Sequence, residues 1–242
     1  MKDRKWLRIL LILGIITLAL VLFYYAFLET ILELIPAIEH GNLDEFTEVL
    51  RASNSRKGVI ATMLLQAIQV WTVVISGTPI QVAAGIVYGT LAGFAMCHAA
   101  FTAAMNAYMV LWRKAGKKLE EWFPVQGLFR KSIDKVLSLD TPPRYTVVLA
   151  NMIPMVPNGI IPIVAAKMDI TVPEFATAVW VGSFLNIFLH CAIGNVLIQG
   201  DWPEALAFSG LMILMVVILW IYQKQILVIL RRIAHGAPKQ EG

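Results

Sequence analysis

Five stretches of the chain contain no aspartate, glutamate, lysine or arginine, and all five are strongly apolar. They cover residues 9–28, 58–112, 145–166, 175–200 and 205–223. A transmembrane helix needs about 20 consecutive apolar residues, so four of the stretches have the length of one span. The stretch 58–112 is too long for two spans and too short for three. Because 58% of the residues are hydrophobic and only 15% are charged, the sequence predicts an integral membrane protein.

The first stretch follows a basic N-terminus, as the apolar core of a signal peptide does. Its apolar core is about twice the usual length of such a segment, and no small-residue cleavage site follows Tyr24 and Tyr25. We therefore predict that residues 1–28 form a cytoplasmic tail and an uncleaved transmembrane anchor.

Basic residues predict which side of the membrane each connecting segment faces, because lysine and arginine concentrate in cytoplasmic loops. Sixteen of the twenty lie before residue 9, in 113–144 or after Tyr222, so these three segments should share the cytoplasmic side. Segment 29–57 has six acidic and three basic residues, and the loop 199–204 has only acidic charges. Both are predicted to be external, 29–57 as an amphipathic segment, and both termini to be cytoplasmic.

Not every apolar stretch can then be a simple span. Three of them lie between the cytoplasmic segment 113–144 and the C-terminus, but only an even number of crossings returns the chain to the same side. We predict that 145–166 does not cross, because its three prolines leave no continuous helix: Pro154, Pro157 and Pro162. Broken backbone at membrane depth is tolerated only where protein buries it or where it lines a wet cavity.

The long stretch 58–112 must likewise make a single net crossing from the outside to the cytoplasm. Its only strong turn signal is Ser76-Gly77-Thr78-Pro79. We therefore predict that 58–94 enters and leaves on the outer face as two half-helices, and that 96–112 crosses the membrane.

The predicted fold is an all-α integral membrane protein built on an inverted repeat. Each repeat is a re-entrant helical hairpin followed by a transmembrane helix. The two repeats comprise 58–94 with 96–112, and 145–166 with 175–198, within a domain of residues 58–200. The N-terminal anchor and a C-terminal transmembrane helix in 205–242, which ends in a basic cytoplasmic tail, flank this domain. A plain bundle of five or six helices with a proline-kinked span is the alternative that the sequence leaves open.

Polar side chains at membrane depth are candidates for function, because such groups usually face a bundle interior or a water-filled cavity. Asn106 and Asn186 each lie near the middle of the helix that follows a hairpin. The repeat would bring both toward the midplane, where inverted-repeat transporters bind substrate. Hydrogen bonds between helices explain the two asparagines equally well.

His98 and His190 are candidate proton carriers, with a packed histidine as the alternative for each. Each stands beside a cysteine, but adjacent helical residues point about 100° apart, so neither pair aims both side chains at one ion. We therefore predict no metal site and no cofactor.

Glycine and proline residues are expected to shape the hairpins. These are Gly77, Pro79, Gly85, Gly89, Pro154, Pro157, Gly159 and Pro162. Gly85, Gly89 and Gly93 stand four residues apart, so on one helix they would form a ladder that lets another backbone come close.

Enzyme signatures are missing from the sequence, which has no Gly-x-Ser-x-Gly, no His-Glu-x-x-His, no Gly-x-x-x-x-Gly-Lys-Ser/Thr and no Cys-x-x-Cys. We therefore predict that the protein is not an enzyme. A membrane enzyme that acts on lipid head groups would need an acid/base pair or a metal, which these residues do not assemble.

Three motifs occur in order within residues 58–200. They are GTPIQVAAGIVYGTLAG, a proline followed by small-small-Gly-x-x-x-Gly; WRKAG, with Arg113 and Gly116; and IPMVPNGIIPIVAA, with Phe175 downstream. Together they resemble the DedA superfamily, in particular its VTT-domain (SNARE-associated, DedA-like) branch of membrane proteins. The resemblance implies paired re-entrant hairpins and the movement of lipids between leaflets, polyprenyl phosphate carriers or phospholipids in bacteria and phospholipids in eukaryotes.

The chain departs from this family pattern in two places. Asn151 stands where relatives commonly have an arginine, and 58–112 lacks the acidic residue that many relatives carry. Arginine suits bidentate phosphate binding and a carboxylate suits proton coupling. Phosphate recognition at Asn151 and a proton-driven mechanism are therefore both in question.

The leading hypothesis is a flippase or scramblase of a bacterial inner membrane that moves a phospholipid or a polyprenyl-phosphate lipid between leaflets. The expected partners are membrane lipids with anionic head groups, and no nucleic acid is expected. The sequence is compatible with a homo-oligomer. The candidate substrate-binding residues are Asn106, Arg113, Asn151, Asn158 and Asn186. Arg113 is alternatively a snorkelling interface anchor. The alternative function is a membrane scaffold that does not transport and that binds partners through the loop 114–144.

Overall fold

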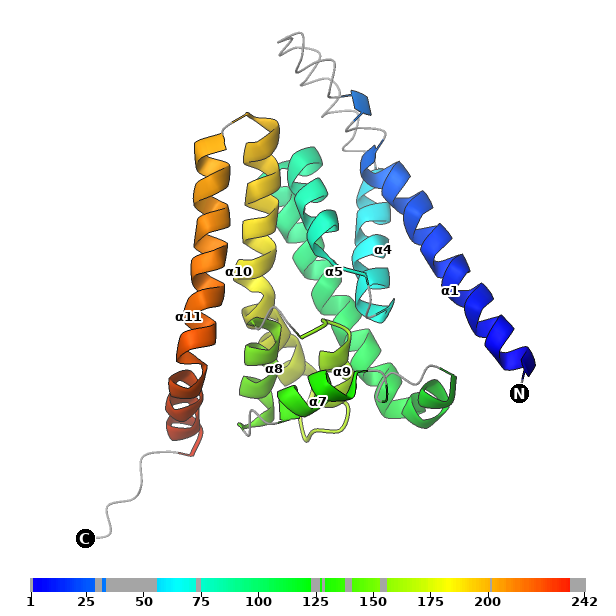
Figure 1. Ribbon diagram of the computed structural model, residues 1–242, viewed down its shortest axis with the longest axis vertical. Helices are drawn as coiled ribbons and strands as arrows, with labels where there is room; N and C mark the ends of the chain where they lie inside the picture. The colour runs from blue at the N-terminus through cyan, green and yellow to red at the C-terminus, as the bar shows by residue number, and fades with distance from the viewer. Residues whose placement is uncertain are drawn as a thin grey trace. The chain divides into compact units, whose positions relative to one another are not determined.

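The computed structural model describes residues 2–28, 32–33, 56–72, 75–122, 127, 129–137, 141–152, 156–200 and 202–235. Every element in this described part is helical (Figure 1). The bounds are α1 Lys2–Phe23, η1 Tyr24–Leu28, α4 Arg56–Thr72, α5 Thr78–Trp122, α7 Arg130–Leu137, α8 Pro143–Met152, α9 Ile160–Ala165, α10 Val172–Ile198 and α11 Trp202–His235. Most of the predicted external segment, Pro154 and the last residues of the C-terminal tail lie outside the described residues.

Two of the described helices are long and apolar enough to cross a membrane, Thr78–Trp122 and Val172–Ile198. Of two shorter apolar helices, Leu13–Leu28 lies within the predicted N-terminal anchor and Trp202–Leu214 overlaps the predicted C-terminal span. Large apolar side chains are exposed on these helices, and Leu206 on α11 is 71% exposed. Extended apolar surface of this kind is rare on soluble monomers and suits contact with lipid.

The chain forms two compact units. Unit 1 consists of Met1–Ala104 and Ile187–Ser209, and unit 2 consists of Met105–Asn186 and Gly210–Gly242. Helices α5 and α10 each contribute one part to unit 1 and the other part to unit 2.

In unit 1, α4 packs against α1 and η1 (Figure 1). The α4 helix ends at Thr72 and α5 begins at Thr78, so the helical chain is broken at the predicted turn. Proline is favoured in the first turn of a helix because its missing N–H would have no partner there, and Pro79 occupies that turn of α5. The N–H of Gln81 donates to the carbonyl of Gly77 at 3.0 Å and starts the helical ladder.

The α5 helix is itself interrupted at Gly89, whose φ of 76° is a conformation that glycine adopts far more readily than other residues. A Cβ atom on Gly93 would lie 2.7 Å from the carbonyl oxygen of Ala84. The bend at Gly89 therefore folds the two parts of α5 against each other. The three spaced glycines thus do not form one ladder on a continuous helix, because the middle one breaks that helix.

The first part of α5 also packs on α10 within unit 1 at two glycines. A Cβ atom on Gly85 would lie 2.0 Å from the carbonyl oxygen of Cys191, and one on Gly194 would lie 2.0 Å from that of Val82. Real Cβ atoms do not approach so closely, so only glycine permits this contact between the two backbones.

In unit 2, α7, α8 and α9 pack together (Figure 1). The α8 helix is ten residues long and α9 is six, and every residue of α9 is buried. The α10 helix starts with a capping box, because the N–H of Thr171 donates to Oε2 of Glu174 at 2.9 Å and the N–H of Glu174 points back to Oγ1 of Thr171 at 3.4 Å. Further along α10, a Cβ atom on Gly182 would lie 2.6 Å from the carbonyl oxygen of Val148 on α8.

One helix extends beyond the predicted span 96–112. The α5 helix continues to Trp122, so the first residues of the predicted cytoplasmic segment 113–144 are helical. Residues 114–121 are rich in lysine and glutamate, which are good helix formers. Another part of the predicted segment forms α7, in which Val136 is buried.

Candidate functional site

Three glutamine side chains are buried in unit 1 beside the break between α4 and α5. Gln66 and Gln69 stand three residues apart on α4 and therefore share a face of it, and Gln81 lies in the first turn of α5. They are 0%, 1% and 3% exposed. Gly77 belongs to the same neighbourhood, because a Cβ atom there would lie 3.0 Å from Nε2 of Gln81 and 3.3 Å from Oε1 of Gln69.

Four side-chain atoms of these glutamines have no hydrogen-bond partner among the described residues. They are Nε2 and Oε1 of Gln66, Nε2 of Gln69 and Oε1 of Gln81. A buried polar group without a partner costs about 1–3 kcal/mol, so proteins keep few of them unless water or a ligand completes the pairing. The break in unit 1 is therefore lined by amide groups available to hydrogen-bond something other than the described protein.

Hydroxyl groups add to the polar character of this part of unit 1. The hydroxyl of Thr62 donates to the carbonyl of Gly58 at 2.9 Å and lies 3.4 Å from the hydroxyl of Tyr88. Thr62 stands four residues before Gln66, so it extends the same face of α4. The buried face of α4 is thus polar along much of its length.

Both candidate proton carriers lie in unit 1 and are buried. Nε2 of His190, on α10, is 3.3 Å from the hydroxyl oxygen of Thr78 at the start of α5. The ring of His98 stacks on that of Phe94, with centroids 4.9 Å apart and planes 21° apart. Within the described residues no group of three or more His, Cys, Asp or Glu side chains could hold a metal ion.

Arg113 occupies unit 2 and contacts backbone. Its Nη2 donates to the carbonyl oxygens of Met168 at 3.3 Å, of Ala165 at 3.5 Å and of Ile170. These carbonyls belong to the end of α9 and the turn that leads to α10, and those of Ala165 and Met168 also accept from the N–H groups of Met168 and Ile170. Arg113 therefore ties α5 to the end of the second broken segment, and this use of a guanidinium was not anticipated.

Asn151 lies at the end of α8 in unit 2 and is 7% exposed. Its Nδ2 donates to the carbonyl of Val147 one turn earlier, at 2.8 Å. Its Oδ1 is buried and has no partner among the described residues. The side chain packs under α10, since a Cβ atom on Gly182 would lie 2.9 Å from its Cβ. The position thus offers one hydrogen-bond acceptor and no charge.

The remaining candidates also fall in unit 2. Asn106 on α5 and Asn186 on α10 are half-buried, as is Asn158, whose carbonyl accepts from the N–H of Ile161 at 3.3 Å. The carbonyl of Pro157 accepts from Ile160 at 2.9 Å, and Pro162 lies buried inside α9. Gly159 has a φ of −68°, a conformation open to any residue.

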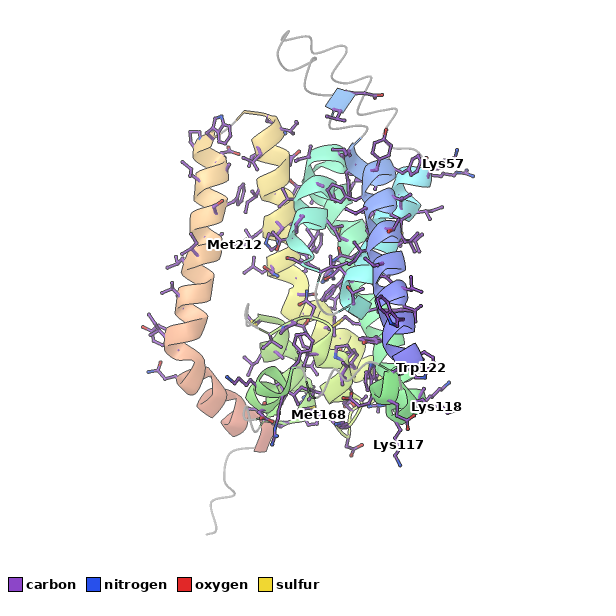
Figure 2. All side chains as sticks on the ribbon, turned by 45° about the vertical axis from the view of Figure 1, so that its right-hand side comes forward. Lys57, Lys117, Lys118, Trp122, Met168 and Met212 are labelled. Atoms are coloured by element: carbon purple, nitrogen blue, oxygen red, sulfur yellow. The ribbon has the colours of Figure 1, made fainter. Side chains whose placement is uncertain are left out.

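A groove of about 1040 Å³ runs along the last turns of α5 in unit 2. Apolar side chains line it at Trp112 and Ile163, together with Ala115 and Ala166. Its charged lining consists of five basic residues, Arg113, Lys114, Lys117, Lys118 and Lys167, and two acidic ones, Glu120 and Glu121. Lys117, Lys118 and Trp122 stand together at this end of α5 (Figure 2). The groove is therefore amphipathic and carries a net positive charge.

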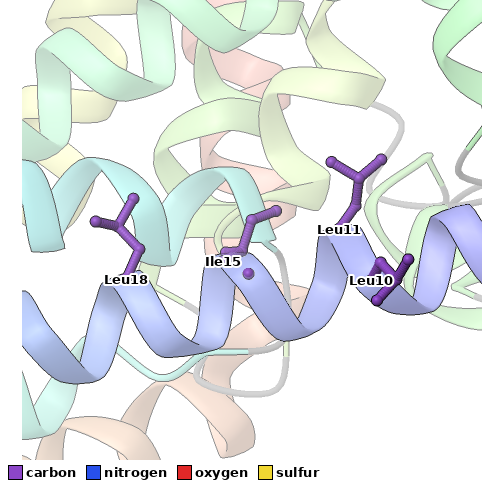
Figure 3. Close-up of a pocket in the computed structure, with 5 residues that line it drawn as sticks. Leu10, Leu11, Ile15 and Leu18 are labelled. Carbon is purple, nitrogen blue, oxygen red and sulfur yellow. The ribbon is translucent and has the colours of Figure 1, made fainter.

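A second pocket, of about 340 Å³, lies on α1 in unit 1 and has almost no polar surface. Its lining consists of Leu10, Leu11, Gly14, Ile15 and Leu18 (Figure 3). Such a surface suits contact with hydrocarbon, and its side chains carry no polar or reactive group.

Two of these features could have been found from sequence. The pattern Thr171-x-x-Glu174 before an apolar run is the signature of a capping box. The i, i+3 spacing of Gln66 and Gln69 in an uncharged apolar stretch places two amides on one face of a helix. By contrast, neither the partners of Arg113 nor the unpaired atoms leave a local trace in the sequence.

Comparison with known protein families gives one match. The model of the VTT domain matches residues 73–196, slightly more than half of the 242-residue chain. The match includes the breaks in both units, the bend at Gly89 and the basic end of α5. No curated protein and no solved structure matches the chain.

Proposed function

The chain belongs to the family of membrane proteins that carry the VTT domain, the DedA-family domain, and on this premise we propose that it moves a phosphorylated lipid between the leaflets of a membrane. The proposed substrate class is a phospholipid or a polyprenyl phosphate. The proposed membrane is the bacterial inner membrane, with both termini in the cytoplasm.

The amphipathic groove at the end of α5 is the observation that carries this proposal. A phosphorylated lipid joins an anion to a long apolar chain, and the groove joins a basic rim to a lining that contains Trp112 and Ile163. Its volume of about 1040 Å³ is at the upper end of the range of about 300–1,000 Å³ that is usual for ligand pockets. Lysine side chains near a membrane surface attract anionic lipids by about 1 kcal/mol each.

The broken helices supply the second part of the mechanism. Each unit contains a broken helical segment with a buried amide at or beside the break, Gln66 in unit 1 and Asn151 in unit 2. Irregular backbone with polar side chains suits a hydrophilic path for a head group, because a lipid-facing span would leave those groups unpaired. The lipid tails would stay in the hydrocarbon while the head group follows this path.

The test is translocation of a fluorescent phospholipid in vesicles that contain the purified full chain. We expect a rate above that of protein-free vesicles, and a several-fold lower rate for the double variant Lys117→Gln/Lys118→Gln, because the groove loses half of its lysines. The matched control is Arg56→Gln/Lys57→Gln, which removes two exposed positive charges from the start of α4. Wild-type rates equal to those of protein-free vesicles would reject the proposal. Equal rates for the two double variants would reject a role of the groove in translocation.

A further inference from the structure

We propose that Gln66, Gln69 and Gln81 form an uncharged binding site for the hydroxyl groups of a lipid head group, such as those of glycerol or a sugar. This inference rests on the proposed function for the ligand being a lipid. It adds a substrate feature that neither the family match nor the basic groove specifies.

Position and burial set these glutamines apart as a site. Two of them share a face of α4 and the third begins α5, so the cluster brings together both sides of the helix break in unit 1. All three are at least 97% buried, and two of them, Gln69 and Gln81, pack so closely on Gly77 that a Cβ atom there would lie 3.0–3.3 Å from their side chains.

The unpaired amide atoms indicate which kind of ligand group could form hydrogen bonds with all of them. Two are NH₂ groups, on Gln66 and Gln69, and two are carbonyl oxygens, on Gln66 and Gln81. A phosphate only accepts hydrogen bonds and would leave both carbonyl oxygens without a donor. An ammonium group only donates and would leave both NH₂ groups without an acceptor. A hydroxyl group donates and accepts, so hydroxyls satisfy both kinds of atom.

The lack of charged residues near the cluster also favours hydroxyl groups as the ligand. Residues 58–112 contain no aspartate, glutamate, lysine or arginine, so the chain around the cluster supplies no ion to neutralise a buried phosphate or ammonium. Burying an ion without a partner is far more costly than burying a neutral polar group that forms hydrogen bonds. The cluster therefore suits the neutral, hydroxyl-bearing end of a head group.

The experiment compares two lipids that differ only in hydroxyls. Phosphatidylglycerol and phosphatidylpropanol carry the same phosphate charge, but only the first has free hydroxyl groups. Retention of each by the purified full chain is measured by native mass spectrometry. We expect the wild-type protein to retain phosphatidylglycerol about threefold to tenfold more strongly, the gain expected from one or two additional hydrogen bonds.

Substitutions link that preference to the cluster. Gln66→Leu/Gln69→Leu should abolish the preference, whereas the control Gln199→Leu, which changes an exposed glutamine after α10, should keep it. Equal retention of the two lipids by the wild-type protein overturns the inference, since water alone then completes the amides. A preference that survives the double substitution also overturns it.

Stability gives an independent measurement that needs no lipid. Replacing an unpaired buried amide by an apolar side chain of similar size should raise the unfolding temperature of Gln66→Leu by about 2–4 °C. A fall in that temperature would show that Gln66 is paired inside the protein and would reject the site. A hydroxyl preference in binding without any translocation would instead reject the proposed function and leave this inference standing.

Discussion

The break in unit 1 and the break in unit 2 lie next to the same kind of neighbour but are built differently. A helix beside each break packs on α10 at a glycine, α5 at Gly194 in unit 1 and α8 at Gly182 in unit 2. In unit 1 the break joins α4, of 17 residues, to α5, and nearby amides have no partner among the described residues. In unit 2 it joins the much shorter α8 and α9, and Arg113 pairs with the carbonyls that follow α9.

The two breaks show two different roles for buried polar side chains. In unit 2 a charged side chain adds hydrogen bonds to backbone carbonyls at the end of a short helix, which stabilises the backbone. In unit 1 buried polar atoms find no partner among the described residues, and proteins keep unpaired groups chiefly where function requires them. The first break is therefore the better candidate for ligand chemistry, and the second for maintaining the fold.

The strongest test of the comparison between the two breaks is the accessibility of introduced cysteines to a membrane-impermeant thiol reagent. Each cysteine either reacts from a given side of the membrane or does not. With Cys97 and Cys191 replaced by alanine, Ser76→Cys should react only from the outside and Asn158→Cys only from the cytoplasm. This opposite accessibility follows if the two segments form the predicted re-entrant hairpins in inverted orientation. Lys57→Cys and Lys117→Cys serve as markers for the two sides. Reaction of both test residues from one side would replace the inverted repeat by the plain helix bundle.

The glycine contacts should show the next largest effect. In Gly85→Ala the new Cβ would lie 2.0 Å from the backbone oxygen of Cys191, so the helices must separate, at a cost of about 3 kcal/mol or more. In Gly182→Ala the closest backbone atom is 2.6 Å away, so a smaller loss is expected. Gly210→Ala meets nothing within 4 Å and should be neutral or stabilising.

Thermal unfolding of the detergent-solubilised variants measures these differences. If Gly85→Ala proves as stable as Gly210→Ala, the close contact between α5 and α10 in unit 1 is wrong.

Arg113 should give the smallest effect of the three. Arg113→Ala removes hydrogen bonds from a charged donor to backbone carbonyls, which are worth about 1.5–3 kcal/mol in all. Arg113→Lys should restore only part of this, because an ammonium lacks the planar fork of a guanidinium. The matched control is Arg144→Ala, which changes an exposed arginine in contact with its neighbour Tyr145.

Unfolding temperatures again provide the measurement. Equal losses for Arg113→Ala and Arg144→Ala would mean that the guanidinium does not support the break in unit 2, and that it is an interface anchor instead.

Much of the helical framework could be predicted from sequence, because its signals are local. Charge-free stretches mark the long apolar helices, the Ser76–Pro79 turn precedes α5, and a proline-rich segment separates α8 from α9. The re-entrant paths and the inverted repeat stay predictions. The α5 helix extends beyond the predicted span 96–112 to Trp122, because lysine and glutamate continue a helix after its apolar part ends.

The sequence by itself determined that this is a helical membrane protein with a VTT domain, since composition, turn residues and motifs are properties of neighbouring residues. Only the tertiary structure decided what the polar residues do. Arg113 donates to backbone carbonyls more than 50 residues away. Oδ1 of Asn151 and four amide atoms of the unit 1 glutamines have no partner within the described part of the chain. Whether a buried polar atom has a partner depends on which distant segments pack against it, and that is settled only when the chain has folded.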